Sequence, residues 1–383
     1  MKIAILGPAY PFRGGISQHT GLLCKNLRSA NHEISLISFR KQFPGFLFPG
    51  KTQFEESSQN IIPESERIFI PWNPLSWFKT ANKIIGAKAD VVICIYWTPF
   101  IAAGYAFICK ALKKKTKVPV LFILHNVIPH EGMPAKEFLT RRAFKYADGF
   151  ISQSKKVEDE LLSFYPAAGQ RWRKIVPHPV YNFQEFSCPG KAEARNELHI
   201  AEGKVLLFFG LVRAYKGLKT LLSSFPEVLK YFDGDIRLII AGEFYDPPGE
   251  YIEMIKRLGI EDKIEIHNRF IPNEEVGTYF SAADVLVLPY ESASQSGVVQ
   301  AAFGFGIPVI STEVGGLPEV IRHGVTGMLC PPSDPQALSA TIIEFYKLAE
   351  SVDFGKNIKD EVSAFSWDNF TNAIDEFTVE AGK

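Results

Sequence analysis

Residues 205–230 read VLLFFGLVRAYKGLKTLLSSFPEVLK. The first five residues are apolar on both faces of an extended chain, which is typical of a strand buried inside a parallel sheet. A turn with glycines at 210 and 217 follows, and apolar residues then recur with helical spacing over 216–230. This stretch therefore predicts one strand–turn–helix unit.

The same alternation continues along the chain. The apolar runs predicted as strands are 3–6, 34–38, 91–95, 118–124, 149–152, 205–209, 236–241, 263–267, 285–289 and 308–311. Amphipathic stretches predicted as helices lie between most of them, including 17–30, 138–146, 155–164, 216–230 and 273–282. Strands separated by helices favour an α/β fold, in which right-handed crossovers give doubly wound parallel sheets.

The length of 383 residues fits two domains. The predicted division lies near 177–191, where prolines and a glycine break the periodicity, and it separates 1–180 from 181–365. A second irregular stretch, 41–66, is long for a loop and is therefore predicted to be functional or mobile.

Bulk composition excludes several classes of protein. Lys plus Arg and Asp plus Glu both number 42, so no whole-surface attraction to nucleic acid is indicated. The five cysteines form no CxxC pair, which disfavours structural zinc and a disulfide framework and favours a reduced, cytoplasmic location. The first residues lack the length of a signal-peptide core.

Two segments bear on membrane contact. Residues 91–109 carry no charge, but Pro99 and Gly104 interrupt them, so a buried strand and a helix are favoured over a membrane span. The basic run 110–117 has two interpretations: a solvated helix end, or a surface that holds the first domain on an anionic bilayer.

Ligands of open parallel sheets bind at the carboxyl ends of the strands. Gly14 and Gly15 follow the first strand and match neither GxGxxG nor a P-loop, yet they allow a close approach to an anion at a helix N-terminus. His125 follows the strand 118–124, where imidazole could contact a sugar hydroxyl or polarise a reacting group. An ordinary turn and a structural histidine are the alternatives.

Three loops of the second half carry further candidates. Arg213 and Lys216 could clamp a diphosphate, although two solvated surface cations would look the same in sequence. After 285–288, Ser296 is predicted to cap a helix, and an ordinary capped turn is the alternative to a phosphate site there. After 308–311, two glycines allow a close approach, and Glu319 could contact ribose or sugar hydroxyls or could be solvated.

The order of these residues resembles the retaining glycosyltransferases of family 4, which have the GT-B fold. The matching segments are Gly14-Gly15, His125-Asn126, Gly210…Arg213-x-x-Lys216-Gly217, Ser296-Gly297, Gly306-Ile307-Pro308-Val309-Ile310 and Gly315-Gly316-Leu317-Pro318-Glu319…Gly324-Val325-Thr326-Gly327. They cover nearly the whole chain, and 304–327 is the most specific part.

The resemblance implies two Rossmann-like domains facing across a cleft, with a final helix of about 366–383 that joins the first, acceptor-binding domain. It implies transfer of a hexose-type sugar, with retention, from a nucleotide-sugar donor to a sugar or lipid-linked glycan acceptor in cell-surface glycan synthesis. The implied catalytic residues are His125, Arg213 and Lys216. The implied donor-binding residues are Gly14, Gly15, Glu291, Gln295, Ser296, Gly297, Gly316 and Glu319.

One motif departs from the family pattern. Family members usually carry two glutamates separated by seven residues, and here the second position falls at Ala301 or Ala302. Glu291 or Ser294-Gln295 would take the place of the first glutamate. The chain therefore resembles a subgroup with a Gln-Ser-Gly loop. No DxD-like motif follows a suitable strand, so neither a metal nor another cofactor is expected. A nucleotide-sugar epimerase and a non-catalytic glycan-binding subunit are the alternative functions.

Overall fold

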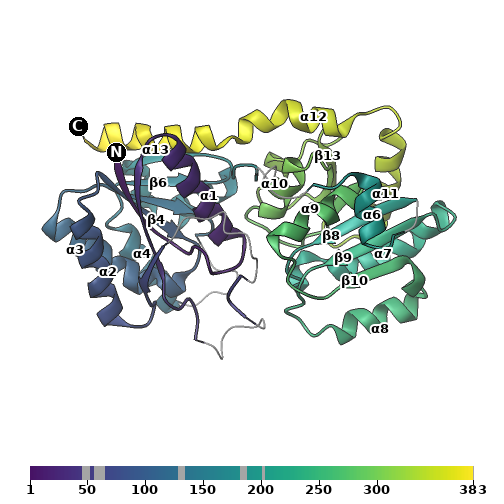
Figure 1. Cartoon of the computed structure of the whole chain (residues 1–383), viewed down its shortest axis with the longest axis horizontal. Helices are drawn as coiled ribbons and strands as arrows, with labels where there is room; N and C mark the ends of the chain where they lie inside the picture. The colour runs from purple at the N-terminus through teal and green to yellow at the C-terminus, as the bar shows by residue number, and fades with distance from the viewer. Residues whose placement is uncertain (45–51, 56–64, 128–133, 182–187, 201–202, 383) are drawn as a thin grey trace. The chain divides into compact units, whose positions relative to one another are not determined.

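The computed structural model describes residues 1–44, 52–55, 65–127, 134–181, 188–200 and 203–382 (Figure 1). Most of the predicted irregular stretch 41–66 lies outside these ranges. The chain divides into two compact units: a first unit of Met1–His178 with Ser366–Lys383, and a second unit of Pro179–Phe365.

The first unit is built on a seven-stranded sheet in the order β3-β2-β1-β4-β5-β6-β7, and every strand pair in it is parallel. Its strands are β1 (Lys2–Leu6), β2 (Glu33–Phe39), β3 (Glu66–Phe69), β4 (Val91–Tyr96), β5 (Val120–Leu124), β6 (Gly149–Ser152) and β7 (Trp172–Ile175). The central strands are buried on both faces, as their continuous apolar runs predict.

Helices cover both faces of this sheet. One face packs against α2 (Pro74–Ala87), α3 (Ala102–Lys115), α4 (Pro134–Phe144) and α5 (Lys155–Phe164). The other face packs against α1 (Gly15–Ser29) and α13 (Trp367–Ala381), two helices from opposite ends of the chain that lie side by side in Figure 1.

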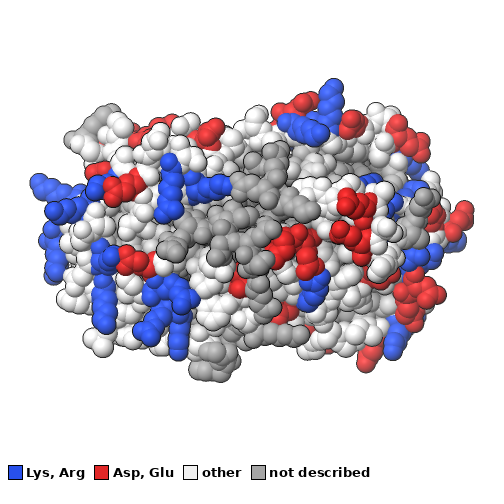
Figure 2. All heavy atoms as spheres, viewed as in Figure 1, with Lys and Arg blue, Asp and Glu red and all other residues white. Residues whose placement is uncertain are grey.

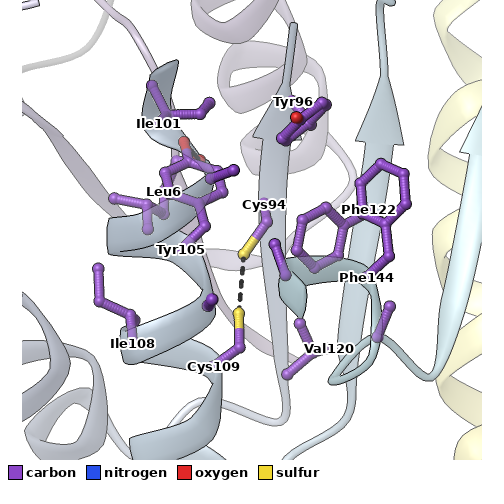
Figure 3. Close-up of a cluster of buried hydrophobic side chains, with 14 of the residues drawn as sticks. Leu6, Cys94, Tyr96, Ile101, Tyr105, Ile108, Cys109, Val120, Phe122 and Phe144 are labelled. Carbon is purple, nitrogen blue, oxygen red and sulfur yellow. Dashed lines mark hydrogen bonds between the residues drawn. The ribbon is translucent and has the colours of Figure 1, made fainter. Parts of the chain in front are cut away.

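Figure 3 shows part of the core between β4 and α3, where Cys109 of the helix points at Cys94 of the strand. The hydroxyl of Tyr105 donates a hydrogen bond to the carbonyl of Ile95 at 3.1 Å. The thiols of Cys94 and Cys109 lie 3.9 Å apart, and the five cysteines, all within the described ranges, form no disulfide. The uncharged stretch 91–109 is therefore a buried strand followed by a core helix. Within the described ranges, no helix has the length and apolarity needed to span a bilayer.

The second unit contains a six-stranded parallel sheet in the order β10-β9-β8-β11-β12-β13. Its strands are β8 (Lys204–Phe209), β9 (Ile236–Ala241), β10 (Ile264–His267), β11 (Val285–Leu288), β12 (Val309–Thr312) and β13 (Gly327–Cys330). Both sheets are thus Rossmann-like, as the alternation of strands and helices predicts.

Two sets of helices flank the second sheet. One core is formed with α7 (Leu218–Tyr231), α8 (Gly249–Leu258), α11 (Pro335–Leu348) and α12 (Phe354–Glu361). The remaining helices are α6 (Lys191–Glu197), α9 (Asn273–Ala282) and α10 (Gly297–Gly304). Of these, α6 packs on α9, and Phe280 of α9 contacts Phe209 of β8 at 5.0 Å between ring centroids.

Candidate active site

The loops after β8, β11 and β12 meet at the carboxyl edge of the second sheet. The backbone N–H of Glu291 donates to the carbonyl of Tyr215 at 2.8 Å, which joins the first two loops. The N–H of Gly316 donates to the carbonyl of Ser294 at 3.2 Å, which joins the second and third. The predicted candidates of this unit therefore lie on one connected set of loops.

Two glycines allow these loops to approach so closely. Gly217 has a φ of +70°, and a Cβ there would lie 1.8 Å from the carbonyl oxygen of Pro289. Gly315 has a φ of +57°, and its Cβ would lie 1.5 Å from the carbonyl oxygen of Ala293. Only glycine fits either position, because a side chain would overlap backbone atoms and also face an unfavourable φ.

Lys216 and Arg213 occupy the short turn between β8 and α7. Lys216 is only 8% exposed, and burial, with a smaller contribution from Arg213, lowers its pKa to about 8. Its Nζ lies 5.6 Å from the centroid of the Tyr290 ring, and the guanidinium of Arg213 lies 4.8 Å from that of Tyr245. Two cations held side by side with one of them buried form a site that an anion would stabilise.

The N-terminus of α10 lies beside the Lys216 ammonium. A Cβ built on Gly210 would lie 3.3 Å from Lys216 Nζ and 3.4 Å from Val298 in the first turn of α10. Ser296 holds the N-cap position, but its side chain makes no capping hydrogen bond, so the predicted cap is wrong. Its hydroxyl lies 3.4 Å from that of Tyr290 instead. The first backbone N–H groups of α10 therefore receive no hydrogen bond acceptor from the Ser296 side chain. An anion site requires such N–H groups to be available to the ligand.

The other predicted donor residues lie around this point. Glu291 is exposed, Gln295 is half-buried, and Gly297 begins α10. Gly316 is buried, and Glu319 is exposed at the end of a 3₁₀ turn rather than in an α-helix.

Ala301 and Ala302 are buried in α10, three and four residues after Val298. That spacing places the two alanines on the same face of the helix as Val298. The two positions at which the sequence predicts the loss of the second family glutamate are therefore buried methyl side chains.

Sequence reasoning missed Glu243, which follows β9 and is 4% exposed. Its carbonyl accepts a hydrogen bond from the N–H of Val212 at 2.9 Å, so the loop after β9 lies against the loop that carries Arg213. The sequence did contain a signal for Glu243, because this residue follows a predicted strand in the same way as the other candidates.

In the first unit, Gly14 holds the N-cap position of α1, Gly15 begins that helix, and His125 follows β5. Gly14 has a φ of +109°, and a Cβ built there would meet no atom of the described residues within 4 Å, so a ligand could approach its backbone. His125 is buried, its ring nitrogens lie 3.3 and 3.4 Å from the side-chain amide nitrogen of Gln153, and its backbone N–H donates to Tyr96.

His125 belongs to a cluster of three buried histidines that sequence reasoning did not anticipate. His19, one turn into α1, lies 4.7 Å from His125 and 4.9 Å from His178 between ring centroids. The cluster lies under α13, since Trp367 and Phe370 are 5.2 and 5.3 Å from His19. Spacing alone could not predict this contact, because the histidines come from three distant segments.

Comparison with known proteins identifies the family. A model of glycosyltransferase family 4 matches residues 13–180, and a model of group 1 glycosyl transferases matches residues 203–347. The chain belongs to the family 4-like glycosyltransferases. The first match lies in the first unit except for its last two residues, and the second match lies within the second unit.

Relatives of this glycosyltransferase support the same conclusion. It is 24% identical to an uncharacterized glycosyltransferase of Methanocaldococcus jannaschii over 96% of this chain and 95% of that protein. It is 30% identical to a D-inositol 3-phosphate glycosyltransferase of Streptomyces avermitilis over 59% of this chain, a match that spans only half of that relative. The structure of Anabaena HepE in complex with UDP-glucose superposes with a TM-score of 0.77 at 18% identity, covering 99% and 100% of the two chains, and shows the GT-B fold.

No group of three or more His, Cys, Asp or Glu side chains within the described ranges of the glycosyltransferase could hold a metal ion. Burial also sets the protonation of the histidine cluster. Burial, and then His178, lowers the pKa of His125 to about 3, and burial lowers the pKa of His19 well below its usual value. Both rings are therefore neutral at pH 7.

This neutral cluster predicts acid sensitivity of the glycosyltransferase. Between pH 6.5 and pH 3 the unfolded chain binds a proton that folded His125 does not, so stability falls as the pH falls. At pH 5 the loss attributable to His125 is about 2 kcal/mol. Urea unfolding can be followed by tryptophan fluorescence, because all five tryptophans belong to the first unit.

The matched variants are His125→Gln and, at an exposed position, His199→Gln. His125→Gln should flatten the dependence of the free energy of unfolding on pH between 7 and 5, whereas His199→Gln should leave it unchanged. An identical pH dependence in His125→Gln and the wild type would contradict the assignment.

Proposed function

We propose that this glycosyltransferase moves a hexose-type sugar from a nucleoside diphosphate sugar to an acceptor with retention of the anomeric configuration. The observation that carries the proposal is the buried ammonium of Lys216, which lies beside Arg213 and the N-terminus of α10. These three sources of positive potential suit a diphosphate better than any neutral ligand.

The positive charge on Lys216 explains why a donor diphosphate would be stabilised at this position. Burial lowers the pKa of Lys216, and a diphosphate placed next to the ammonium would raise that pKa again by stabilising the charged form. As the anomeric bond breaks, negative charge grows on the departing diphosphate. Lys216, Arg213 and the amides of α10 would stabilise that growing charge more than they stabilise the bound donor, which is the condition for faster turnover.

The remaining candidates would hold the two other parts of the donor. Glu291, Gln295 and Ser296 would contact the transferred sugar or the nucleotide, and Gly297, Gly316 and Glu319 would line the same edge. In the first unit, Gly14 and Gly15 would face the donor phosphate, and neutral His125 would lie near the reacting carbon as a hydrogen-bonding group.

A nucleotide-sugar donor is supported by the relatives. Anabaena HepE has been solved with UDP-glucose, and the Streptomyces relative is named a D-inositol 3-phosphate glycosyltransferase. For this chain we propose a sugar or lipid-linked glycan acceptor and a role in cell-surface glycan synthesis at the cytoplasmic face of the membrane.

A panel of UDP- and GDP-sugars tests the proposal. The expected result is a rise in melting temperature with one nucleotide class, followed by transfer to an acceptor with the anomeric configuration retained in the NMR spectrum of the product. Release of an isomerised sugar with no acceptor would identify an epimerase. Binding without turnover for every donor would identify a non-catalytic subunit, and either outcome would reject transfer.

Metal removal gives a separate prediction. Because Lys216 and Arg213 would neutralise the diphosphate, we expect transfer to continue at an unchanged rate after dialysis against EDTA. Activity that EDTA abolishes and Mg²⁺ or Mn²⁺ restores would show that the cationic residues do not suffice.

A further inference from the structure

The segment from Arg67 in β3 to Lys117 before β5 is strongly basic, although the whole chain has no net charge. Residues 67–117 contain eight lysines and one arginine but a single acidic residue, Asp90. This excess is concentrated on two neighbouring helices, because neither α2 nor α3 contains an Asp or Glu. Figure 2 shows Lys and Arg side chains gathered over the side of the molecule where Figure 1 draws these helices.

Large apolar side chains protrude among these lysines. Leu75 and Phe78, in the first turns of α2, are 75% and 54% exposed, and Trp72 just before the helix is 42% exposed. On α3, Phe107 is 39% exposed. Such side chains are costly to leave in water when they are grouped, and grouped apolar residues among cations mark an interaction surface.

The two helices present one continuous face. The ring of Phe107 lies 6.0 Å from that of Trp77 on α2, and Lys115 Nζ lies 5.8 Å from the centroid of the Phe78 ring. We call the exposed side chains here the α2–α3 face: Trp72, Leu75, Phe78, Lys79, Phe107, Lys110 and Lys114. In the described part of the chain, no carboxylate lies within ion-pair distance of the lysines of this face, unlike Lys83, which pairs with Glu66.

We propose that the α2–α3 face docks on an anionic bilayer, with Leu75 and Phe78 inserted at the headgroup level and the lysines on the lipid phosphates. The lysines of the face favour an anionic partner. The exposed Leu75 favours a partner that also offers an apolar layer. A nucleic acid would offer Leu75 no apolar environment. The basic residues are nearly all lysines rather than the arginines that bind bases bidentately.

Docking through the α2–α3 face rests on the proposed membrane location of the protein. It does not depend on the sugar-transfer chemistry. It can therefore be tested without any donor, by co-sedimentation with vesicles of phosphatidylcholine alone or containing about one-quarter phosphatidylglycerol. The wild type should bind the anionic vesicles, should not bind the neutral ones, and should be released by high salt.

Two double variants separate the apolar and charged contributions. Lys110→Glu with Lys114→Glu should weaken vesicle binding at least about 25-fold, at roughly fivefold per lost cation. Leu75→Ser with Phe78→Ser should abolish retention on the vesicles at moderate salt. The matched controls change exposed residues on other helices, Ile252→Ser with Val379→Ser and Lys256→Glu with Lys359→Glu, and should bind as the wild type does.

Equal binding of the wild type to neutral and anionic vesicles, or equal losses in the controls, would overturn the proposal. So would binding to an RNA oligonucleotide without binding to vesicles. Nucleotide release from a soluble donor should be unchanged in all four variants, so failure of the membrane surface and failure of sugar transfer give different results. Circular dichroism confirms that each variant is folded.

Discussion

Replacing Lys216 by methionine is expected to lower turnover by about 10²–10³-fold, in the range seen when one group that stabilises transition-state charge is removed. The ammonium is buried beside Arg213 and the N-terminus of α10, where the proposed leaving diphosphate gains charge. Methionine fills similar space without the charge. The loss should therefore appear mainly in kcat, measured as release of nucleoside diphosphate.

The same substitution should not weaken the fold. Burial lowers the pKa of Lys216 to about 8, so removal of the charge should leave the melting temperature of the free enzyme unchanged or raise it. The control is Lys219→Met, which changes an exposed lysine three residues away that pairs with Glu250. If Lys216→Met unfolds the protein, or if Lys219→Met loses as much turnover, Lys216 is not the charge-stabilising group.

Substituting Gly217 by alanine is expected to destabilise the second unit by about 3 kcal/mol, a sum of positive-φ strain and steric overlap. A Cβ at this position would lie 1.8 Å from the carbonyl oxygen of Pro289, so the loops after β8 and β11 would have to separate. Urea unfolding followed by circular dichroism gives the loss of free energy. Because the same loops hold Lys216, turnover should fall as well.

Gly306 provides a closely matched control for this prediction. Its φ is +71° against +70° at Gly217, but its Cβ would meet no atom of the described part of the chain within 4 Å. Gly306→Ala should therefore cost only the positive-φ strain, about 1 kcal/mol, and should leave turnover unchanged. Equal losses in the two variants would mean that the close approach to Pro289 contributes nothing to stability.

The strands that sequence reasoning predicted are those with continuous apolar runs, such as Val205–Phe209 within β8. It missed β3, β7 and β13, all of which lie at sheet edges. An edge strand has one neighbour, and β3 and β7 are partly exposed, so their sequences alternate less clearly and include charged residues. Their pairing is decided by the strand beside them, which local periodicity does not report.

The residues of the candidate site were predictable where they directly follow the end of a strand. Arg213, Lys216 and the glycine loops could be found because parallel strands bring their carboxyl ends to one edge. Burial of Lys216 and the contact between His19 and His125 were not predictable, because both depend on packing between distant segments. The expected Ser296 cap failed for a related reason: the hydroxyl lies near Tyr290, which a local capping pattern does not include.

The central claim is that Arg213 and Lys216 of the second unit bind and activate the diphosphate of a nucleotide sugar. The most direct test measures release of UDP or GDP from a panel of nucleotide sugars, in the presence of acceptor, for the wild type, Arg213→Ala and Lys216→Met. We predict release from at least one donor by the wild type and a loss of about 10²-fold or more in both variants. Release that is unchanged in either variant would contradict the account.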